Sequence, residues 1–357
     1  MVKLIQVLVG GLGATFALML AGIAYQSWGT RRDARRYPAP GRLVDIGSHR
    51  LHVVECGAGS LTIVLESGLM STVLSWSALQ GKLAESFRVV SYDRAGLGWS
   101  DLGPMPRTAD RIVDELNTLL ERANVPPPYL LVGHSFGGLT MPLFAARFPD
   151  RVAGVVLIDP VVPKEWHPPA AHELRLATIG AKVCRRAALL ARFGILRCIA
   201  ALLKTGAKRS ANRLVRLISR GSPGDSGTVS SPWFAALPDN EKAMASVFWI
   251  QPKFALTIAS QLGHLPASAA KAAEFDDFCR QPVTILTAGT APERRRQEHA
   301  AMAARLPLGS HILATNSNHW IMQEEPELVI GAIEKVVEYW KAADRPATIS
   351  PNLRQNV

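Results

Sequence analysis

Residues 130–138 read Leu130-Leu131-Val132-Gly133-His134-Ser135-Phe136-Gly137-Gly138. An apolar run starts at Tyr129, directly after three prolines, and stops at Gly133, which is typical of a short buried strand. The next apolar segment, Leu139 to Phe148, is compatible with a helix. Ser135 therefore stands at a sharp turn from strand to helix, which exposes its hydroxyl at the carboxyl end of the strand. The pattern predicts that Ser135 is a catalytic nucleophile; the alternative is a glycine-rich helix cap.

A serine hydroxyl is a weak nucleophile until a base removes its proton, so Ser135 needs a histidine partner. The chain has 9 histidines, most of which lie beside the serine, in strand-like segments or in helical segments. His319 instead lies in the loop Thr315–Trp320, after the last predicted strand and before a closing helix that starts near Glu325. Because such a loop can lean over the sheet toward the serine, we predict that His319 is the general base. The alternative is a solvated loop histidine.

Five motifs in this order resemble the serine-dependent α/β hydrolases with a helical cap. The matching residues span about Gly41 to Trp340. The motifs are a strand with the loop after it (Leu61–Leu69), a glycine-rich turn (Asp93–Ser100), the elbow (Gly133–Gly138), a later strand (Val155–Asp159) and the late histidine His319. The resemblance implies an α/β-hydrolase fold, with a mostly parallel central sheet flanked by helices. It also implies a helical cap inserted before the last two strands.

The resemblance further implies an oxyanion hole made of two backbone N–H groups. One belongs to Phe136, directly after the nucleophile, and the other to Leu69, in the loop after the strand that ends near Leu65. Ser67 stands where the family usually has a histidine, which changes the hydrogen bonds expected to brace that loop but not the use of a backbone amide. Asp93 is expected to brace its own glycine-rich turn.

Two carboxylates compete for the acid that would orient His319. Most relatives carry an aspartate a few residues beyond the strand that here reads Val283–Thr287, but no aspartate stands between that strand and Glu293. Asp159 ends the strand after the elbow helix, a place from which some superfamily members supply their acid. We favour Asp159, because a rigid strand end holds a carboxylate more firmly than a loop. Glu293 and a purely structural Asp159 are the alternatives.

Length and composition favour one large domain with an insertion: the chain has 357 residues, of which 48% are hydrophobic. Apolar strands alternate with helical stretches, which predicts a mostly parallel sheet covered on both faces. Leu43–Ile46 and Leu51–Cys56 are predicted to pair as an edge hairpin. We expect a membrane anchor at residues 1–30 and a linker at 31–40. The hydrolase core is expected at residues 41–160 and 276–342, with a helical cap at 161–275 between its two parts. Residues 343–357 are expected to be a disordered tail.

The N-terminus predicts a transmembrane anchor. Leu4 to Tyr25 are 22 residues without a charge, and as a helix they would span about 33 Å, enough to cross a bilayer. A signal peptide cleaved near Ala24, followed by export, is the alternative, although its apolar region is usually shorter. Four arginines between residues 31 and 36 follow the run, against Lys3 and the amino terminus before it. The positive-inside rule therefore favours a single-pass protein with a cytoplasmic catalytic domain.

The net charge of +11 is concentrated in the predicted cap. Val161 to Phe275 carry 16 Lys and Arg against 6 Asp and Glu, many of them interleaved with apolar residues between Lys182 and Arg220. This composition suits anionic lipid headgroups, with an ordinary solvated basic face as the alternative. We expect no nucleic acid partner, because no such motif is present. The four cysteines show no metal-ligand spacing, so we expect no metal site. We also expect no cofactor.

The sequence therefore predicts a membrane-anchored serine hydrolase that cleaves a small-molecule carboxylic ester, with lipid-like esters among the candidates, through an acyl-enzyme on Ser135. The same residues also serve amidases, thioesterases, C–C hydrolases, acyltransferases and cofactor-free haloperoxidases. A different class is a catalytically silent scaffold that binds a ligand or partner. The missing aspartate after Thr287 favours the scaffold, whereas the presence of both Ser135 and His319 argues against it.

Overall fold

A computed structural model describes residues 1–204, 234, 237–275 and 280–343. The expected disordered tail and the central part of the predicted basic cap therefore fall largely outside the described residues. Within the described ranges, eight strands form one sheet: β1 (Arg42–Asp45), β2 (Arg50–Cys56), β3 (Thr62–Glu66), β4 (Arg88–Tyr92), β5 (Tyr129–His134), β6 (Val152–Ile158), β7 (Val283–Ala288) and β8 (Gly309–Ala314).

The strands lie in the order β1-β2-β4-β3-β5-β6-β7-β8. Strands β1 and β2 pair antiparallel at one edge, which confirms the predicted hairpin, and β2 also pairs antiparallel with β4. All other neighbours, from β4 to β8, are parallel. The sheet is therefore mostly parallel, as predicted, and the carboxyl ends of β3 to β8 meet along one edge.

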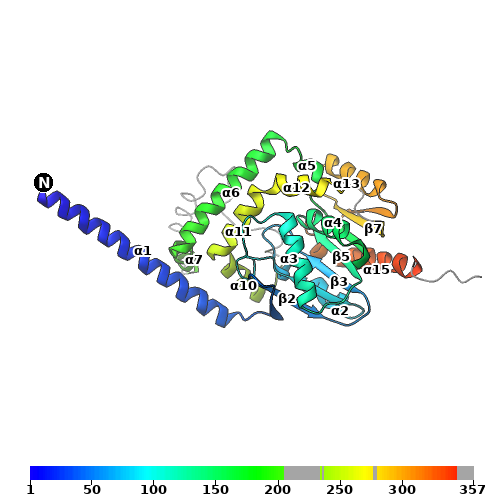
Figure 1. Ribbon diagram of the computed structural model, residues 1–357, viewed down its shortest axis with the longest axis horizontal. Helices are drawn as coiled ribbons and strands as arrows, with labels where there is room; N and C mark the ends of the chain where they lie inside the picture. Colours follow the sequence, from blue (N-terminus) through cyan, green and yellow to red (C-terminus); the bar gives the residue numbers. More distant parts are fainter. Residues whose placement is uncertain (205–233, 235–236, 276–279, 344–357) are drawn as a thin grey trace, which may run out of the picture.

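Helices cover both faces of the sheet (Figure 1). On one face Val64, Leu131 and Val155 pack in a cluster with side chains of α3 (Ala109–Arg122), α4 (Gly137–Arg147) and α13 (Glu293–Arg305). On the other face Ile63 and Leu130 pack against α2 (Ser77–Ala84) and α15 (Pro326–Ala343). Since successive side chains of a strand point to opposite faces, both sets are buried and the strands read as continuous apolar runs.

The segment between β6 and β7 is helical where it is described, as the sequence predicts. Its helices are α5 (Pro163–Trp166), α6 (Ala171–Arg192), α7 (Ile195–Lys204), α10 (Asp239–Trp249), α11 (Pro252–Gly263) and α12 (Leu265–Ala273). Helices α6 and α11 lie side by side (Figure 1). Helix α11 is tied to the glycine-rich turn after β4, because the Lys253 ammonium donates to the carbonyls of Gly98 and Ser100 at 2.9 and 2.6 Å. Burial lowers the pKa of Lys253 to about 8.

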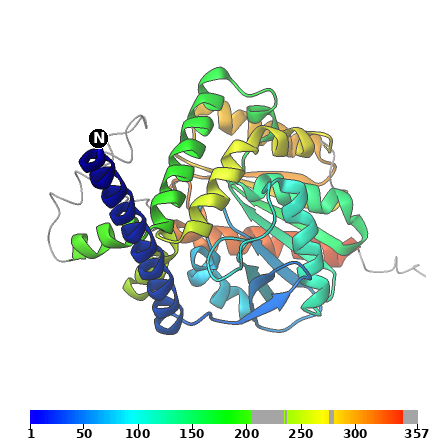
Figure 2. The same ribbon diagram turned by 60° about the vertical axis from the view of Figure 1, so that its left-hand side comes forward.

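Helix α1 (Val2–Arg36) projects from the rest of the chain (Figures 1 and 2). It is the one described helix that is long and apolar enough to cross a membrane, properties that a signal sequence shares. Its last turns continue through the first six residues of the segment expected to be a linker. The helix ends just before Pro38, because proline disfavours helical backbone in the residue that precedes it.

Candidate active site

Ser135 occupies the turn between β5 and α4, with a backbone φ of +52°. This left-handed conformation costs a residue other than glycine about 1–3 kcal/mol, so the surroundings must hold it. The Ser135 amide donates to the carbonyl of Ile158 at 3.0 Å, and the Ser135 carbonyl accepts from the amides of Gly138 and Val161 at 2.9 and 2.8 Å. A Cβ on Gly133 would lie 2.7 Å from the carbonyl oxygen of Gly137, so the turn requires glycine there.

Asp159 and His319 meet at the carboxyl edge of the sheet. Asp159 directly follows β6, and His319 lies in the loop after β8, 40% exposed. The Nδ1–H of His319 donates to Asp159 Oδ2 at 2.5 Å, and the other carboxylate oxygen accepts from the amide of Ala288 at 3.2 Å. Burial by itself raises the pKa of Asp159, but the hydrogen bond and charge of His319 outweigh it, so the pKa lies below its usual value. Asp159 is therefore a buried carboxylate at neutral pH.

Glu293, the alternative acid, makes its contacts within its own helix. It is at the start of α13, where its carboxylate pairs with Arg296 at 2.9 Å and accepts from Gln297 at 2.9 Å. Its side chain is 65% exposed, and none of these partners belongs to the loop of His319. Of the two carboxylates that the sequence leaves open, the structure brings Asp159 to the histidine.

His134 fixes the histidine loop beside the nucleophile. Its ring is buried, 4.6 Å from the ring of His319 and 4.6 Å from that of Trp320. Burial lowers the pKa of His134 to about 3, so the ring is neutral and its Nε2–H donates to the His319 carbonyl at 2.8 Å. Among the described side chains, no hydrogen bond joins Ser135 to His319; such bonds are often long in free enzymes and shorten with substrate.

The two amides predicted to form an oxyanion hole belong to residues close to the predicted nucleophile. Phe136 follows Ser135, and Leu69 follows Gly68, where an added Cβ would come within 3.2 Å of the Ser135 Cβ. Within the part of the chain that is described, neither amide donates to a protein acceptor. The loop of Leu69 is braced by Ser67, which takes the place of the usual histidine: its hydroxyl accepts from the Trp76 indole at 2.9 Å and donates to a backbone carbonyl.

Arg94 is a site residue that the sequence reasoning missed. Its buried guanidinium donates to Glu66 Oε1 at 2.6 Å, to the carbonyl of Ser67 and to the carbonyl of Gly68 at 2.5 Å. It also lies 5.2 Å from the ring centre of Phe136. One signal could have found it: Glu66 and Arg94 stand at the carboxyl ends of strands that a parallel sheet can place side by side.

Gly68 and Leu69 share one planar peptide unit, whose C=O and N–H point in opposite directions. Because Arg94 holds the C=O of Gly68, it also fixes the direction of the Leu69 N–H.

Asp93, which precedes Arg94, braces the glycine-rich turn as predicted: its carboxylate accepts from the amides of Val73 and Trp99 at 2.9 and 3.1 Å.

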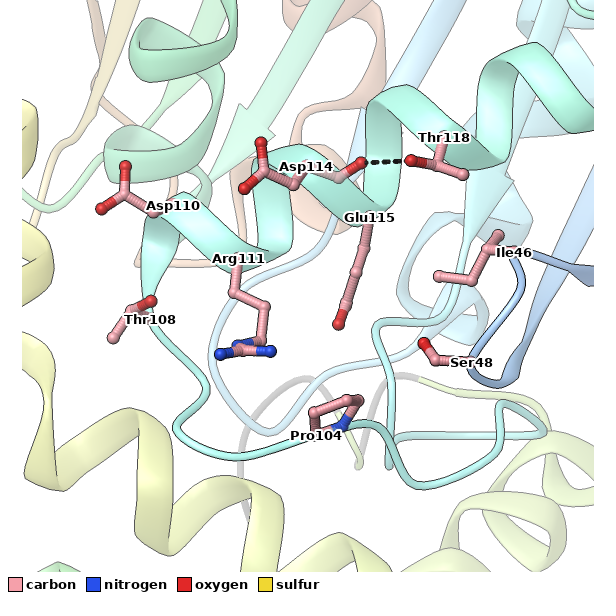
Figure 3. A pocket seen from close by; sticks show the side chains of 9 residues that line it. All are labelled: Ile46, Ser48, Pro104, Thr108, Asp110, Arg111, Asp114, Glu115 and Thr118. Atoms are coloured by element: carbon pink, nitrogen blue, oxygen red, sulfur yellow. Dashed lines mark hydrogen bonds between the residues drawn. The ribbon is translucent and has the colours of Figure 1, made fainter.

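A cavity of about 380 Å³ beside α3 has no part in this arrangement. Figure 3 shows Arg111 and Glu115 pointing from α3 toward the loop that carries Pro104. Ser135, Asp159 and His319 are absent from its lining, and the Glu115 carboxylate already pairs with the buried Arg107. Over the described ranges, no three His, Cys, Asp or Glu side chains are grouped as metal ligands.

Residues 62–183 match a family model described as alpha/beta hydrolase fold. An uncharacterised protein of Bacillus subtilis, YqjL, is 38% identical over 120 residues, which are 31% of this chain and 47% of YqjL. A 2-(acetamidomethylene)succinate hydrolase of Mesorhizobium japonicum is 34% identical over 118 residues, 33% of this chain and 42% of the hydrolase. The matched segments thus span about half or less of these curated relatives.

Solved structures match over more of the chain. A thermophilic esterase from Thermogutta terrifontis aligns with a TM-score of 0.58 and 20% identity, over 85% of this chain and 99% of the esterase. An enol-lactonase from Burkholderia xenovorans aligns with a TM-score of 0.53 and 18% identity, over 84% and 100% of the two chains. At these identities the likeness is one of fold. Together with the family match and the sheet topology, it shows that the chain has the α/β-hydrolase fold.

Proposed function

We propose that this protein is a serine hydrolase that cleaves a carboxylic ester through an acyl-enzyme on Ser135. The observation that carries the proposal is the hydrogen bond between His319 and the buried Asp159, at the edge of the sheet where Ser135 sits in a strained turn. A carboxylate on Nδ1 fixes the imidazole tautomer that leaves Nε2 free to accept a proton. That arrangement is what a serine nucleophile needs.

In the proposed reaction, Nε2 of His319 accepts the hydroxyl proton of Ser135 while Oγ attacks the ester carbonyl carbon. The carbonyl electrons move to oxygen, and the amides of Leu69 and Phe136 stabilise the oxyanion. The imidazolium then protonates the departing alkoxide, which leaves as the alcohol. Water, deprotonated by His319, cleaves the acyl-enzyme by the same steps, and Asp159 stabilises each imidazolium.

An ester is the proposed substrate class because structural relatives include an esterase and an enol-lactonase. Related sequences include a 2-(acetamidomethylene)succinate hydrolase and a putative carbamate hydrolase, so cleavage of an amide-like bond is the second candidate.

We propose that residues 161–275 form a cap that determines which substrates reach Ser135, over a core of residues 41–160 and 276–342. A panel of p-nitrophenyl esters with short to long acyl chains, run beside the corresponding anilides, separates the two candidates.

We also propose that α1 anchors the protein in a membrane as a single span, with the catalytic domain on the cytoplasmic side. Large apolar side chains up to residue 20 of α1 are exposed, among them Leu12, Phe16 and Leu20 at 71%, 65% and 51%. Exposed apolar surface of this length is favourable in a bilayer and unfavourable in water. The arginines that follow the apolar run support the orientation.

A fluorophosphonate probe should label Ser135 in the wild-type chain, and Ser135→Ala should abolish labelling and ester turnover.

His319→Ala should reduce ester turnover by about three orders of magnitude or more, since the nucleophile loses its proton acceptor. His172→Ala, which changes an exposed histidine on α6, is the control and should leave turnover unchanged. A chain that never labels would favour the silent scaffold, and a His319→Ala variant with a tenth of wild-type turnover would exclude His319 as the base.

The two carboxylates can be separated by isosteric amides. Asp159→Asn keeps the shape but removes the charge that stabilises the imidazolium, so turnover should fall by about 10⁴. Glu293→Gln should be nearly silent, because Glu293 contacts only its own helix among the described residues. Steady-state kinetics with one ester measure both. Wild-type turnover in Asp159→Asn together with a large loss of turnover in Glu293→Gln would assign the acid to Glu293 instead.

Arg94 is expected to act as a positioning residue. Lysine at this position keeps a positive charge for Glu66 but lacks the planar fork that holds two carbonyls, so Arg94→Lys should lower kcat about 10- to 100-fold with little change in KM. Arg107→Lys is the matched control, because Arg107 is equally buried and paired with Glu115, away from the proposed catalytic groups. Equal losses of kcat in both variants would mean that Arg94 acts only through stability.

The anchor can be tested by charge substitution within α1. The full chain should remain in the membrane pellet after alkaline carbonate extraction. The triple variant Leu12→Asp, Phe16→Asp and Leu20→Asp should be released, since each charge near the bilayer centre costs about 3 kcal/mol. The same three positions changed to alanine should stay in the pellet. A shortened soluble chain that begins near Tyr25 would instead identify a cleaved signal peptide.

A further inference from the structure

A second cavity lies where α1 meets the helical segment that follows β6. It measures about 270 Å³ and is bordered by the last turns of α1, by α7 and by the end of α10. Its lining combines aromatic rings with guanidinium groups, and includes Trp28, Arg32, Arg36, Tyr37 and Arg197. None of the proposed catalytic residues lines it.

Arg197 is the buried group of this cavity, with only 9% of its surface exposed. Its Nη1 pairs with Asp33 at 2.6 Å and its Nε donates to Gln26 at 3.2 Å. Its Nη2 is buried and has no acceptor among the described groups. An unpaired buried donor on a charged group is costly, and Arg197 lines the cavity, so its guanidinium points to an acceptor supplied from outside the chain.

Two more arginines line the cavity with their side chains exposed. Arg32 stacks over the ring of Trp28 and Arg36 over that of Tyr37, each with 5.4 Å between the guanidinium carbon and the ring centre. Both arginines are exposed, and neither forms an ion pair within the described ranges. Asp33 is the one carboxylate in the lining, and Arg197 already neutralises it. The cavity is therefore electropositive, which favours an anion.

The place of the cavity along α1 indicates which anion. Arg32 stands seven residues beyond Tyr25, the end of the uncharged run, which is about 10 Å along a helix. This is the depth of the lipid headgroups when the run fills the hydrocarbon core. Trp28 has the interfacial position that tryptophan favours beside a membrane. On α7, Leu202 and Leu203 are 41% and 40% exposed, and such apolar side chains suit the boundary between headgroups and acyl chains.

We propose that this cavity binds the phosphate of an anionic phospholipid, with the Arg197 guanidinium as the inner donor group and those of Arg32 and Arg36 as the outer ones. Guanidinium groups bind phosphate oxygens through paired, charge-assisted hydrogen bonds. The choice of a lipid rests on the proposed span of α1, whereas the phosphate chemistry rests on the cavity alone. The site is separate from the proposed catalytic centre and would fix the catalytic domain against the membrane surface.

The test uses the full chain in nonionic detergent micelles and counts bound lipid by native mass spectrometry. Phosphatidylglycerol should bind about tenfold more tightly than phosphatidylcholine with the same acyl chains, because the choline ammonium repels the arginines. The double variant Arg32→Gln and Arg36→Gln should lose about tenfold in affinity for phosphatidylglycerol. Asp33→Asn should increase the affinity, since it removes the carboxylate that competes for Arg197.

Arg35→Gln is the matched control, because Arg35 is exposed on the same helix but does not line the cavity. An equal loss in Arg35→Gln, or equal binding of both lipids, would overturn the proposal. Displacement of the lipid by millimolar inorganic phosphate would assign the site to a soluble phosphate and overturn the lipid source. The measured quantity is bound lipid and not ester turnover, so this test fails or succeeds independently of the proposed hydrolase.

Discussion

The buried guanidinium of Arg94 is the constraint that organises the residues at the carboxyl ends of the parallel strands. A buried charge is tolerated only when it is paired and its donors are satisfied. Arg94 meets this demand with Glu66 and with the carbonyls of Ser67 and Gly68, and it stacks on Phe136. These partners come from the end of β3 and from the elbow. One charge therefore fixes the loop and the turn that flank Ser135.

Parallel strands explain how residues far apart in the chain come together at the candidate site. The carboxyl ends of β5, β6 and β8 lie at one edge, so the residues that follow them meet although they are far apart in the chain. Asp159 and His319 are separated by 160 positions and still form a hydrogen bond of 2.5 Å. The strained backbones of Ser135 and Asp159, with φ of +52° and +40°, fall on this edge. Strain of this kind persists only where neighbouring hydrogen bonds hold it.

The N-terminal helix is joined to the rest of the chain by close packing and by charge. A Cβ on Gly22 would lie 2.3 Å from the carbonyl of Phe193, and one on Gly29 would lie 2.4 Å from the Arg197 side chain. Glycine at these positions lets α1 approach the start of α7 closely. The pair between Arg197 and Asp33 then closes the contact. The helix that is proposed to span the membrane thus also contacts the segment proposed as the cap.

The sequence by itself determined the features that depend on neighbouring residues. The glycines around Ser135 and the apolar strands are patterns set by neighbouring residues, so the elbow and the fold could be predicted from them. The uncharged run that ends at Tyr25 is a pattern of the same kind. Helix α1 continues to Arg36, within the segment expected to be a linker, and ends just before Pro38. Tertiary structure alone decided which of the two carboxylates meets His319 and that Arg197 borders a cavity. Each of these contacts joins residues from separate elements, and sequence spacing carries no information about the distance between them.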